Sequence, residues 1–455
     1  MEMRVEEIVK ACGGKLLCGR GDAAVTSVET DSRAVRPGAL FVPIRGERTD
    51  AHRFIPSVLE AGAAAVLTQE HGSADGAGAW IAVRDTREAL RKIAGAYRAK
   101  FQIPVVGVTG SVGKTTTKEM IGLALSAGLR VMKTEGNFNS QIGVPLTVFR
   151  LSPEHQAAVV EMGMSDFGEM GRIAQVARPT CAVMTNIGMS HLENLKTRQN
   201  IRSEKLHITD CFTKDSVLFL NGDDPLLAEL DHTLPFRTVR FGMDPRCDWR
   251  AEDVKSEGDR TEFTAAFSGR RLKLTLPVPG LHNVRNALAA LAVAEHLGVG
   301  AEKAARALAS YRSPAMRQQV IRAGGVTVLD DSYNASPDSV RSSIDVLHGL
   351  KKGGRAVCVF ADMLELGDLS AQAHFETGVY AARSGVDALF TVGEQAKEIA
   401  RGARSENPSL PVFSFLTNEE ASQSLKAYLR PGDAVVVKGS RGMKTDEIVR
   451  SLTQG

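Results

Sequence analysis

Residues 105–120, which read VVGVTGSVGKTTTKEM, constrain the fold of this chain more than any other stretch. The stretch begins with a short apolar run rich in valine, which is typical of a buried strand. A glycine-rich turn follows and ends in Gly-Lys-Thr, and a helix-like run begins at Thr117. This order of strand, glycine turn and helix predicts a phosphate-binding loop.

The residue types of this loop suit a bound anion. Glycines let backbone N–H groups point at a phosphate, and the N-terminus of the following helix adds partial positive charge. Lys114 is expected to reach the β- and γ-phosphates of a nucleotide, and the Thr115 hydroxyl is expected to hold Mg²⁺. The strict pattern asks for glycine at position 108, where this chain has Val108, so a generic ATPase is disfavoured. The alternative is a glycine turn that only joins a strand to a helix.

Length, charge and cysteine spacing restrict the class of protein. A chain of 455 residues predicts roughly two to four domains, because single cores stop growing well below that length. The net charge of +3 does not indicate a nucleic-acid or membrane surface. No apolar run approaches the roughly 20 residues of a membrane span, and the first residues lack a signal-peptide core. Six scattered cysteines without a Cys-x-x-Cys pair predict free thiols in a reducing cytoplasm.

Apolar strands alternate with helical stretches along most of the chain, which predicts an α/β protein of three domains. The pattern of residues 1–100 predicts a small α/β unit. A strand is expected at residues 27–33, and the unit ends in an amphipathic helix. Residues 101–313 predict a mainly parallel sheet, with antiparallel runs around 236–278. Residues 314–455 predict a Rossmann-like α/β sheet. Its strands are expected at residues 326–330, 355–360, 388–392, 411–415 and 434–438.

Polar residues follow several of these strands, where open α/β sheets bind ligands. Glu161 ends an apolar strand, and a lone carboxylate there suits Mg²⁺, which prefers oxygen ligands. His191 lies in a loop after the next strand, and taken alone such a histidine is more often structural than a metal ligand. The turn at residues 136–139, Gly-Asn-Phe-Asn, either binds substrate or caps the next element. Asp331 either meets a ligand or caps the helix after Pro337.

These segments, taken in order, resemble the ATP-dependent Mur ligases of peptidoglycan synthesis over nearly the whole chain. The family's displaced loop glycine also accounts for Val108. The motifs that carry the resemblance are TGSVGKTT at residues 109–116, GNFN at 136–139, EMG at 161–163, NIG at 186–188 with His191, and HNxxNA at 282–287. Three further motifs resemble the dipeptide-adding branch of the family, and they are DSYNASPDS at 331–339, DMLELG at 362–367 and KGSR at 438–441.

The resemblance implies an enzyme, its substrates and its cofactors. It implies an ATP-dependent carbon–nitrogen ligase that adds D-alanyl-D-alanine to UDP-N-acetylmuramoyl-tripeptide in the cytoplasm, through an acyl phosphate, with release of ADP and phosphate. Two Mg²⁺ ions are expected, and the chain is expected to be a monomer with no nucleic-acid partner. Either diaminopimelate or lysine can be the third residue of the accepted peptide.

The resemblance also implies the site residues. Those implied for ATP are Thr109, Gly110, Ser111, Val112, Gly113, Lys114, Thr115 and Thr116 at the phosphates, Asn286 at the adenine, Arg317 near phosphate and Asp331 at the ribose. Those implied for metal are Thr115, Glu161, His191 and Lys205, and catalysis is implied for Lys114, Glu161, His191 and Lys205. Those implied for the substrates are Asp31, Ser32, Arg33, Asn137, Asn139, Tyr333, Asn334, Lys438, Ser440 and Arg441.

Lys205 has two alternative interpretations. Read from the residues alone, Glu204 and Lys205 are a charged pair on a solvated helix. The resemblance implies instead a lysine that the family carbamylates. Burial and nearby positive charge would lower the pKa of such a lysine, and its neutral amine could then react with CO₂ to give a metal-binding carbamate.

Two alternatives to this function stay open at the level of sequence. One is a Mur ligase that adds a single amino acid, although the Asp-Asn-Pro-Arg string of those enzymes is missing here. The other is a phosphate-loop regulatory ATPase that ligates nothing. Three positions depart from the family pattern, and they are Ala51 in Asp-Ala-His, His207 two residues after Lys205, and Ser336 in Tyr-Asn-Ala-Ser-Pro.

Overall fold

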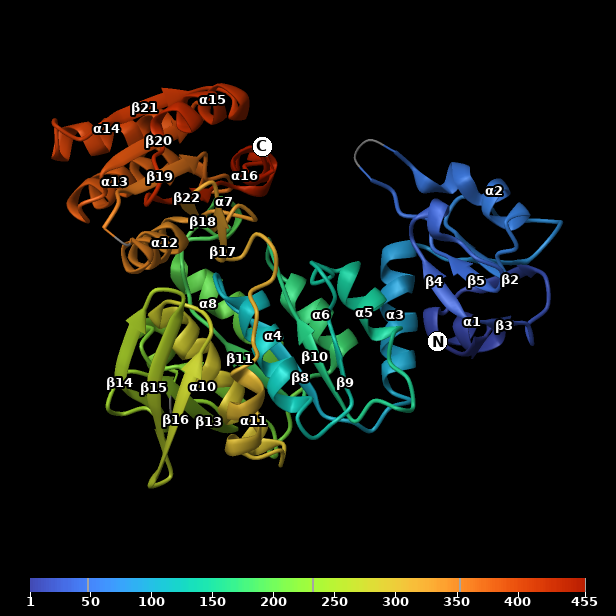
Figure 1. Ribbon diagram of the computed structural model, residues 1–455. Coiled ribbons are helices and arrows are strands. Elements are labelled where there is room, and N and C mark those ends of the chain that lie inside the picture. The colour runs from blue at the N-terminus through green and yellow to red at the C-terminus, as the bar shows by residue number, and fades with distance from the viewer. Residues whose placement is uncertain (47–48, 231–232, 352, 455) are drawn as a thin grey trace.

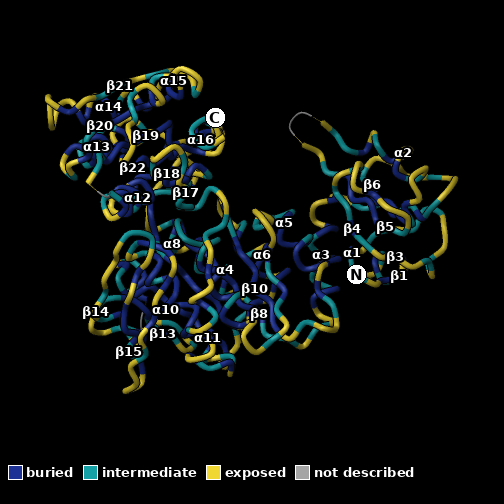
Figure 2. The backbone as a smooth tube through the Cα atoms, in the orientation of Figure 1, coloured by how far each residue is buried: buried dark blue, intermediate teal, exposed yellow. Residues whose placement is uncertain are grey.

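The computed structural model describes residues 1–46, 49–230, 233–351 and 353–454 and has three lobes (Figure 1). The N-terminal lobe is blue, the central lobe runs from cyan to yellow, and the C-terminal lobe is orange to red. Figure 2 shows that the buried backbone concentrates in the interior of each lobe. Among the described residues, no helix is both long enough and apolar enough to cross a bilayer, and the six cysteines are free thiols.

The N-terminal lobe is built on a five-stranded sheet of order β2-β7-β6-β5-β4. Its strands are β2 (Lys15–Cys18), β4 (Ser27–Glu29), β5 (Ala39–Phe41), β6 (Ala65–Thr68) and β7 (Ala79–Ala82), with β1 (Met3–Arg4) paired to β3 (Ala24–Val25) beside it. Its helices are α1 (Val5–Cys12), η1 (Ser32–Ala34), η2 (Ala51–Phe54) and α2 (Ile55–Glu60). The strand predicted at 27–33 is therefore too long, because Asp31 accepts a hydrogen bond from the Arg33 amide and starts η1.

Helix α3 (Thr86–Arg98) joins the first lobe to the second. Asp85 caps it by accepting a hydrogen bond from the Glu88 amide at 2.7 Å. The apolar stripe expected from the sequence, which includes Leu90 and Ile93, is fully buried. The helix packs against α1 on one side and against two helices of the central lobe, α5 (Gly143–Val148) and α6 (Glu169–Ala177), on the other.

The central lobe contains a nine-stranded sheet of order β16-β15-β14-β13-β12-β11-β8-β10-β9. The pairs from β9 to β14 are parallel, and β14 to β16 are antiparallel. The antiparallel prediction is right for β14 to β16 but wrong for β13, which pairs in parallel with both neighbours. The strands are β8 (Val105–Thr109), β9 (Val131–Lys133), β10 (Ala157–Glu161), β11 (Cys181–Met184), β12 (Val217–Asn221), β13 (Arg237–Gly242), β14 (Trp249–Glu257), β15 (Arg260–Phe267) and β16 (Arg270–Leu276).

Helices cover both faces of the parallel part of this sheet. Alternate residues of β8 point to opposite faces, so Val105 belongs to the core under α3, α5 and α6, and Val106 and Val108 belong to the core on the other face. That other core contains α4 (Lys114–Leu125), α10 (Leu281–His296) and α11 (Ala301–Leu308). The remaining helices are α7 (Leu192–Leu195), α8 (Arg198–Leu206), η3 (His207–Thr209) and α9 (Pro225–Ala228).

The C-terminal lobe is a six-stranded sheet of order β17-β18-β22-β19-β20-β21, parallel except for the edge strand β17. Its strands are β17 (Gln319–Ala323), β18 (Val326–Asp330), β19 (Ala356–Ala361), β20 (Ala388–Val392), β21 (Val412–Phe415) and β22 (Ala434–Lys438). Its helices are α12 (Pro337–Leu350), η4 (Gly367–Leu369), α13 (Ser370–Arg383), α14 (Ala396–Glu406), α15 (Asn418–Tyr428), η5 (Arg441–Met443) and α16 (Asp446–Thr453). The predicted strands are confirmed within a residue, and β17 was not foreseen.

Candidate active site between the central and C-terminal lobes

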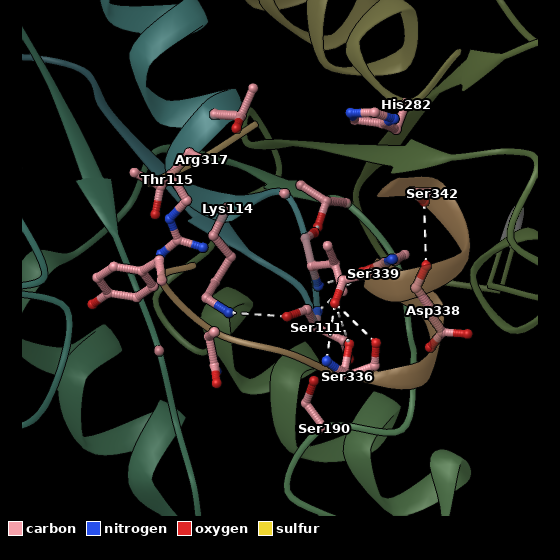
Figure 3. A pocket seen from close by; sticks show the side chains of 18 of the residues that line it. Ser111, Lys114, Thr115, Ser190, His282, Arg317, Ser336, Asp338, Ser339 and Ser342 are labelled. Atoms are coloured by element: carbon pink, nitrogen blue, oxygen red, sulfur yellow. Dashed lines mark hydrogen bonds between the residues drawn. The ribbon is translucent and has the colours of Figure 1, made fainter. Parts of the chain in front are cut away.

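A cavity of about 370 Å³ lies at the end of β8 and is lined by residues of two lobes. Figure 3 shows Lys114 and Thr115 from the central lobe and Arg317 and Asp338 from the C-terminal lobe around this space. The two lobes also touch directly, because Asp338 accepts a hydrogen bond from the Met189 amide at 3.3 Å. A ligand in the cavity would therefore contact both lobes at once.

The phosphate loop connects β8 to α4, and the end of β11 holds its shape. The Asn186 side-chain oxygen accepts hydrogen bonds from the amides of Ser111 and Val112 at 3.1 and 2.8 Å. The Thr185 hydroxyl donates to the Val112 carbonyl at 2.5 Å. Asn186 was part of a sequence motif but was not predicted as a site residue. Its role depends on β11 lying beside β8, which the sheet order provides.

Any residue other than glycine at position 110 would distort the loop. Its φ is +147°, and a Cβ built there would lie 1.9 Å from the Thr185 hydroxyl oxygen. We expect Gly110→Ala to lower the free energy of unfolding by about 3 kcal/mol or more, since backbone strain and overpacking add. The control is Gly136→Ala, where φ is +52° but the added Cβ meets no described atom within 4 Å, with a cost of about 1 kcal/mol. Equal losses in urea denaturation would contradict this account.

Lys114 is folded over its own loop. Its ammonium donates to the Gly110 carbonyl at 2.8 Å and lies 3.4 Å from the Ser111 carbonyl. Burial of the charged form lowers the pKa of Lys114, and the positive charge of Arg317 lowers it further, against the opposing effect of Glu161. The Lys114 ammonium thus lies at the cavity against carbonyls of its own loop, and a bound anion would stabilise its charged form.

Glu161 is buried at the end of β10 beside this loop. One carboxylate oxygen accepts hydrogen bonds from the Thr115 hydroxyl at 3.2 Å and the Asn139 amide at 2.7 Å. The other oxygen has no hydrogen-bond partner among the described residues and lies 3.9 Å from the Lys118 ammonium. A buried carboxylate oxygen without a donor, next to a hydroxyl and a phosphate loop, fits the oxygen ligands that Mg²⁺ requires.

His191 lies at the junction of the two lobes. It precedes α7 in the left-handed conformation, with φ of +63°. Its Nδ1 atom is 2.6 Å from a carboxylate oxygen of Glu365 in the C-terminal lobe, although the angles fall outside those of a hydrogen bond. The contact with His191 lowers the pKa of Glu365. The sequence did not single out Glu365 as a site residue.

Lys205 is fully buried on α8, so the solvated charged pair considered from the sequence is wrong. The Glu204 carboxylate instead accepts hydrogen bonds from the amides of Gly168 and Met170 at 2.8 and 2.9 Å. The Lys205 ammonium has no hydrogen-bond partner among the described residues. Burial lowers the pKa of Lys205 well below its usual range, and the nearby charge of Lys114 lowers it further. A neutral, reactive amine is the form that this environment favours.

Asn286 lies underneath the phosphate loop. Its side-chain oxygen accepts a hydrogen bond from the Thr117 hydroxyl at 3.0 Å and would be 3.3 Å from a Cβ at Gly113. Its amide group lies 3.4 Å from the side-chain oxygen of Asn283. Asn286 therefore borders the cavity at the start of α4.

The C-terminal lobe contributes a buried ion pair and a stacked arginine. The Lys438 ammonium donates to the Asp331 carboxylate at 2.6 Å and to the Asn334 carbonyl at 3.0 Å. Burial lowers the pKa of Lys438, against the opposing effect of Asp331. The Arg317 guanidinium lies 3.7 Å from the centre of the Tyr333 ring. All of these residues line the cavity.

Some predicted substrate residues lie outside this cavity. Asn137 is exposed. The Ser440 hydroxyl is buried and accepts a hydrogen bond from the Leu364 amide at 2.8 Å. Arg441 is largely exposed, with its guanidinium 5.7 Å from the Tyr333 ring centre.

The N-terminal lobe has a second cavity, of about 580 Å³, which Asp50, His52 and Trp80 help to line. The predicted substrate residues 31–33 are not among the residues that line this second cavity. Arg33 instead forms an exposed ion pair with Asp31 at 2.6 Å. The Asp-Ala-His sequence at 50–52 is the signal by which this cavity could have been foreseen.

Comparisons with known proteins extend over the whole chain. Three family models match successive segments. They are described as Mur ligase family, catalytic domain (residues 24–98), Mur ligase middle domain (108–294) and Mur ligase, glutamate ligase domain (316–441).

Single proteins match over almost their full length. The chain is 38% identical to the UDP-N-acetylmuramoyl-tripeptide--D-alanyl-D-alanine ligase of Bacillus subtilis, over 94% of this chain and 93% of that protein. It resembles MurF from Acinetobacter baumannii with a TM-score of 0.93 and 30% identity, over 100% and 99% of the two chains. It resembles MurF from Thermotoga maritima in complex with ADP with a TM-score of 0.84 and 28% identity, over 94% and 97%.

The solved MurF structures share the three-domain α/β architecture, so the predicted fold class is confirmed. Because the matches cover nearly all of this chain and of its relatives, the chain belongs to the Mur ligase family and is MurF-like within it.

Proposed function

We propose that the protein is an ATP-dependent ligase of peptidoglycan synthesis that joins D-alanyl-D-alanine to UDP-N-acetylmuramoyl-tripeptide. One observation carries the proposal: the phosphate loop, the buried Glu161 and the C-terminal pair of Asp331 and Lys438 all lie around one cavity. The name of the Bacillus subtilis relative supplies the substrates. Both are polar precursors, which supports a cytoplasmic enzyme, and we propose that it acts as a monomer.

The three lobes divide the work in this proposal. Residues 1–100 bind the uridine nucleotide, residues 101–313 bind ATP, and residues 314–455 bind the dipeptide and close over ATP. This division fits the position of the cavity, because its walls come from the second and third lobes. The dipeptide amine would then enter next to the γ-phosphate. Closure would also keep water away from a reactive intermediate.

ATP is held mainly by the phosphate loop. Gly113 and Lys114 contact its phosphates through backbone amides and the ammonium, because the loop opens into the cavity there. Arg317 lies near phosphate and Asp331 at the ribose, and both line the same space. Asn286 is placed at the adenine. The rest of the proposed nucleotide contacts are Thr109, Gly110, Ser111, Val112, Thr115 and Thr116.

Mg²⁺ supplies charge neutralisation of the phosphates when it is bound. Thr115 and Glu161 would hold one ion, since the Thr115 hydroxyl and the Glu161 oxygen that has no hydrogen-bond partner among the described residues adjoin the loop. His191, Glu161 and a carbamylated Lys205 would hold a second. A carbamate replaces a cation by a two-oxygen anion, which suits a hard metal.

The chain's own groups then perform an amide-forming reaction in two steps. The terminal carboxylate of the tripeptide attacks the γ-phosphorus, the bond to the ADP oxygen breaks, and an acyl phosphate forms. The Lys114 ammonium stabilises the negative charge that develops on the phosphoryl oxygens. The amine of D-alanyl-D-alanine next attacks the acyl carbon, loses a proton and expels phosphate. The cavity walls hold both reactants in line during this exchange.

The remaining predicted contacts are placed at the two ends of the substrates. Asp31, Ser32 and Arg33 are proposed for the uridine nucleotide, although the Asp31 and Arg33 side chains pair with each other here. Asn137 and Asn139 are proposed for the muramoyl peptide. Those proposed for the dipeptide are Tyr333, Asn334, Lys438, Ser440 and Arg441.

Phosphate release should be coupled to both substrates. We expect rapid release from ATP only when UDP-N-acetylmuramoyl-tripeptide and D-alanyl-D-alanine are present together, because the acyl phosphate needs a carboxylate to form and an amine to resolve. A colorimetric phosphate assay with each substrate omitted in turn measures this. Equal rates with a single amino acid in place of the dipeptide would indicate an amino-acid-adding ligase. Strong release with neither substrate would indicate a regulatory ATPase.

A further inference from the structure

Glu365 reaches from the C-terminal lobe to His191 of the central lobe. Its carboxylate is 2.6 Å from the His191 Nδ1 atom. The Glu365 carbonyl also accepts a hydrogen bond from the Glu193 amide at 3.4 Å, at the first turn of α7. The Gly367 backbone then packs against Glu193, where an added Cβ would come within 3.1 Å of its Cα. A short loop after β19 therefore packs closely against the segment that carries His191.

The loop is held firmly from its own side. The Met363 amide donates to the buried His374 ring at 2.9 Å, and the Leu364 amide donates to the Ser440 hydroxyl at 2.8 Å. Leu366 is buried in the C-terminal core. These contacts fix the backbone on both sides of Glu365, so its carboxylate is presented in a defined place.

Both residues at the contact adopt an uncommon backbone. Glu365 has φ of +65° and His191 has φ of +63°, in the left-handed region that non-glycine residues seldom occupy. Such conformations are strained and persist where the surroundings require them. Two of them facing each other across a lobe junction point to a contact that the fold maintains at a cost.

A carboxylate in this position is what a metal-binding histidine usually requires. Such a histidine usually gives its second ring N–H to a carboxylate, which fixes the ring and its tautomer. With Nδ1 facing Glu365, the Nε2 atom remains for a metal ion. The angles are not yet those of a hydrogen bond, and contacts of this kind often tighten only when the site is loaded. The positive charge of Lys114 in the phosphate loop also acts on the Glu365 carboxylate.

We propose that Glu365 is a positioning residue that fixes the His191 ring across the lobe junction and so makes metal binding depend on docking of the C-terminal lobe. The inference rests on the proposed role of His191 as a metal ligand. It extends that role, because a residue of the dipeptide-binding lobe would complete a site that belongs to the ATP-binding lobe. Closure of the third lobe and assembly of the metal site would then be one event.

The test measures Mn²⁺ affinity of the full chain with ADP present, by electron paramagnetic resonance of the free ion. We expect Glu365→Gln to raise the dissociation constant roughly tenfold or more, as loss of such partners does elsewhere. Glu365→Asp should recover part of the affinity. Glu193→Gln is the matched control, since it removes a neighbouring exposed carboxylate that does not touch His191, and its affinity should stay within twofold.

A double-mutant cycle separates positioning from other roles. In a His191→Ala background, Glu365→Gln should cause no further loss, because the carboxylate acts through the ring. A further tenfold loss there would overturn the proposal and make Glu365 an independent ligand or a simple tether. Unchanged Mn²⁺ affinity of Glu365→Gln would also overturn it. The titration needs neither tripeptide nor dipeptide, so its outcome stands apart from the substrate assay, and thermal unfolding of each variant checks its fold.

Discussion

Lys114→Ala should reduce phosphate release by roughly 10³-fold, the scale seen when a group that stabilises transition-state charge is removed. Among the described residues, the ammonium donates only to carbonyls of its own loop, at Gly110 and Ser111, so its loss should leave the fold intact. Its main partner is expected to be the charge that develops on the phosphoryl oxygens, which makes the effect fall on turnover more than on substrate binding.

The measurement is steady-state phosphate release at saturating substrates, together with thermal unfolding. Lys303→Ala serves as the control, because Lys303 is an exposed lysine on α11 of the same lobe. The control should match the wild-type rate. Turnover of Lys114→Ala within a few-fold of wild type would contradict the phosphate-loop assignment.

Lys205→Ala should lose most of the activity, and a small carboxylic acid such as acetate should restore part of it. The physical reason is that the Lys205 ammonium is fully buried and has no hydrogen-bond partner in the part of the chain that the structure describes, so its charged form is unfavourable. Burial lowers the pKa of Lys205 and leaves an amine that can form a carbamate. Acetate in the vacated space would supply the two oxygens that the carbamate supplied.

The control for this rescue is Lys214→Ala, which changes an exposed lysine and should neither lose activity nor respond to acetate. Lys205→Glu gives a second variant, since it places a carboxylate on the same helix without added acid and should retain more activity than the alanine variant. Near-normal turnover of Lys205→Ala, together with an unmodified Lys205 in an experimental structure, would refute the carbamate.

Local patterns explain which parts of the fold the sequence could predict. The phosphate loop was foreseeable because strand, glycine turn and Gly-Lys-Thr are adjacent in the chain. Helix α3 was foreseeable because its apolar stripe is strong and Asp85 marks its start. Strand β17 was missed because it is a short, half-buried edge strand, for which burial imposes no clear alternation.

Long-range contacts explain what the sequence could not supply. Asn186 stabilises the phosphate loop only because β11 and β8 are neighbours in the sheet. Glu204 and Lys205 are adjacent in sequence, yet Glu204 accepts a hydrogen bond from the start of α6, whereas Lys205 is buried with no hydrogen-bond partner among the residues described. Glu365 meets His191 only through the docking of two lobes. None of these relations has a period or a motif that a single sequence would reveal.

In the proposed reaction, a substrate carboxylate takes the γ-phosphoryl group of ATP before the dipeptide amine displaces it. The direct test uses UDP-N-acetylmuramoyl-tripeptide labelled with ¹⁸O in its terminal carboxylate, with mass spectrometry of both products. If the carboxylate attacks first, the ligated product has the mass of the labelled tripeptide plus the dipeptide less H₂¹⁸O, because one carboxylate ¹⁸O atom leaves with the released phosphate and the other stays in the new amide. Phosphate without the label, or ATP consumption without a ligated product, would contradict this reaction.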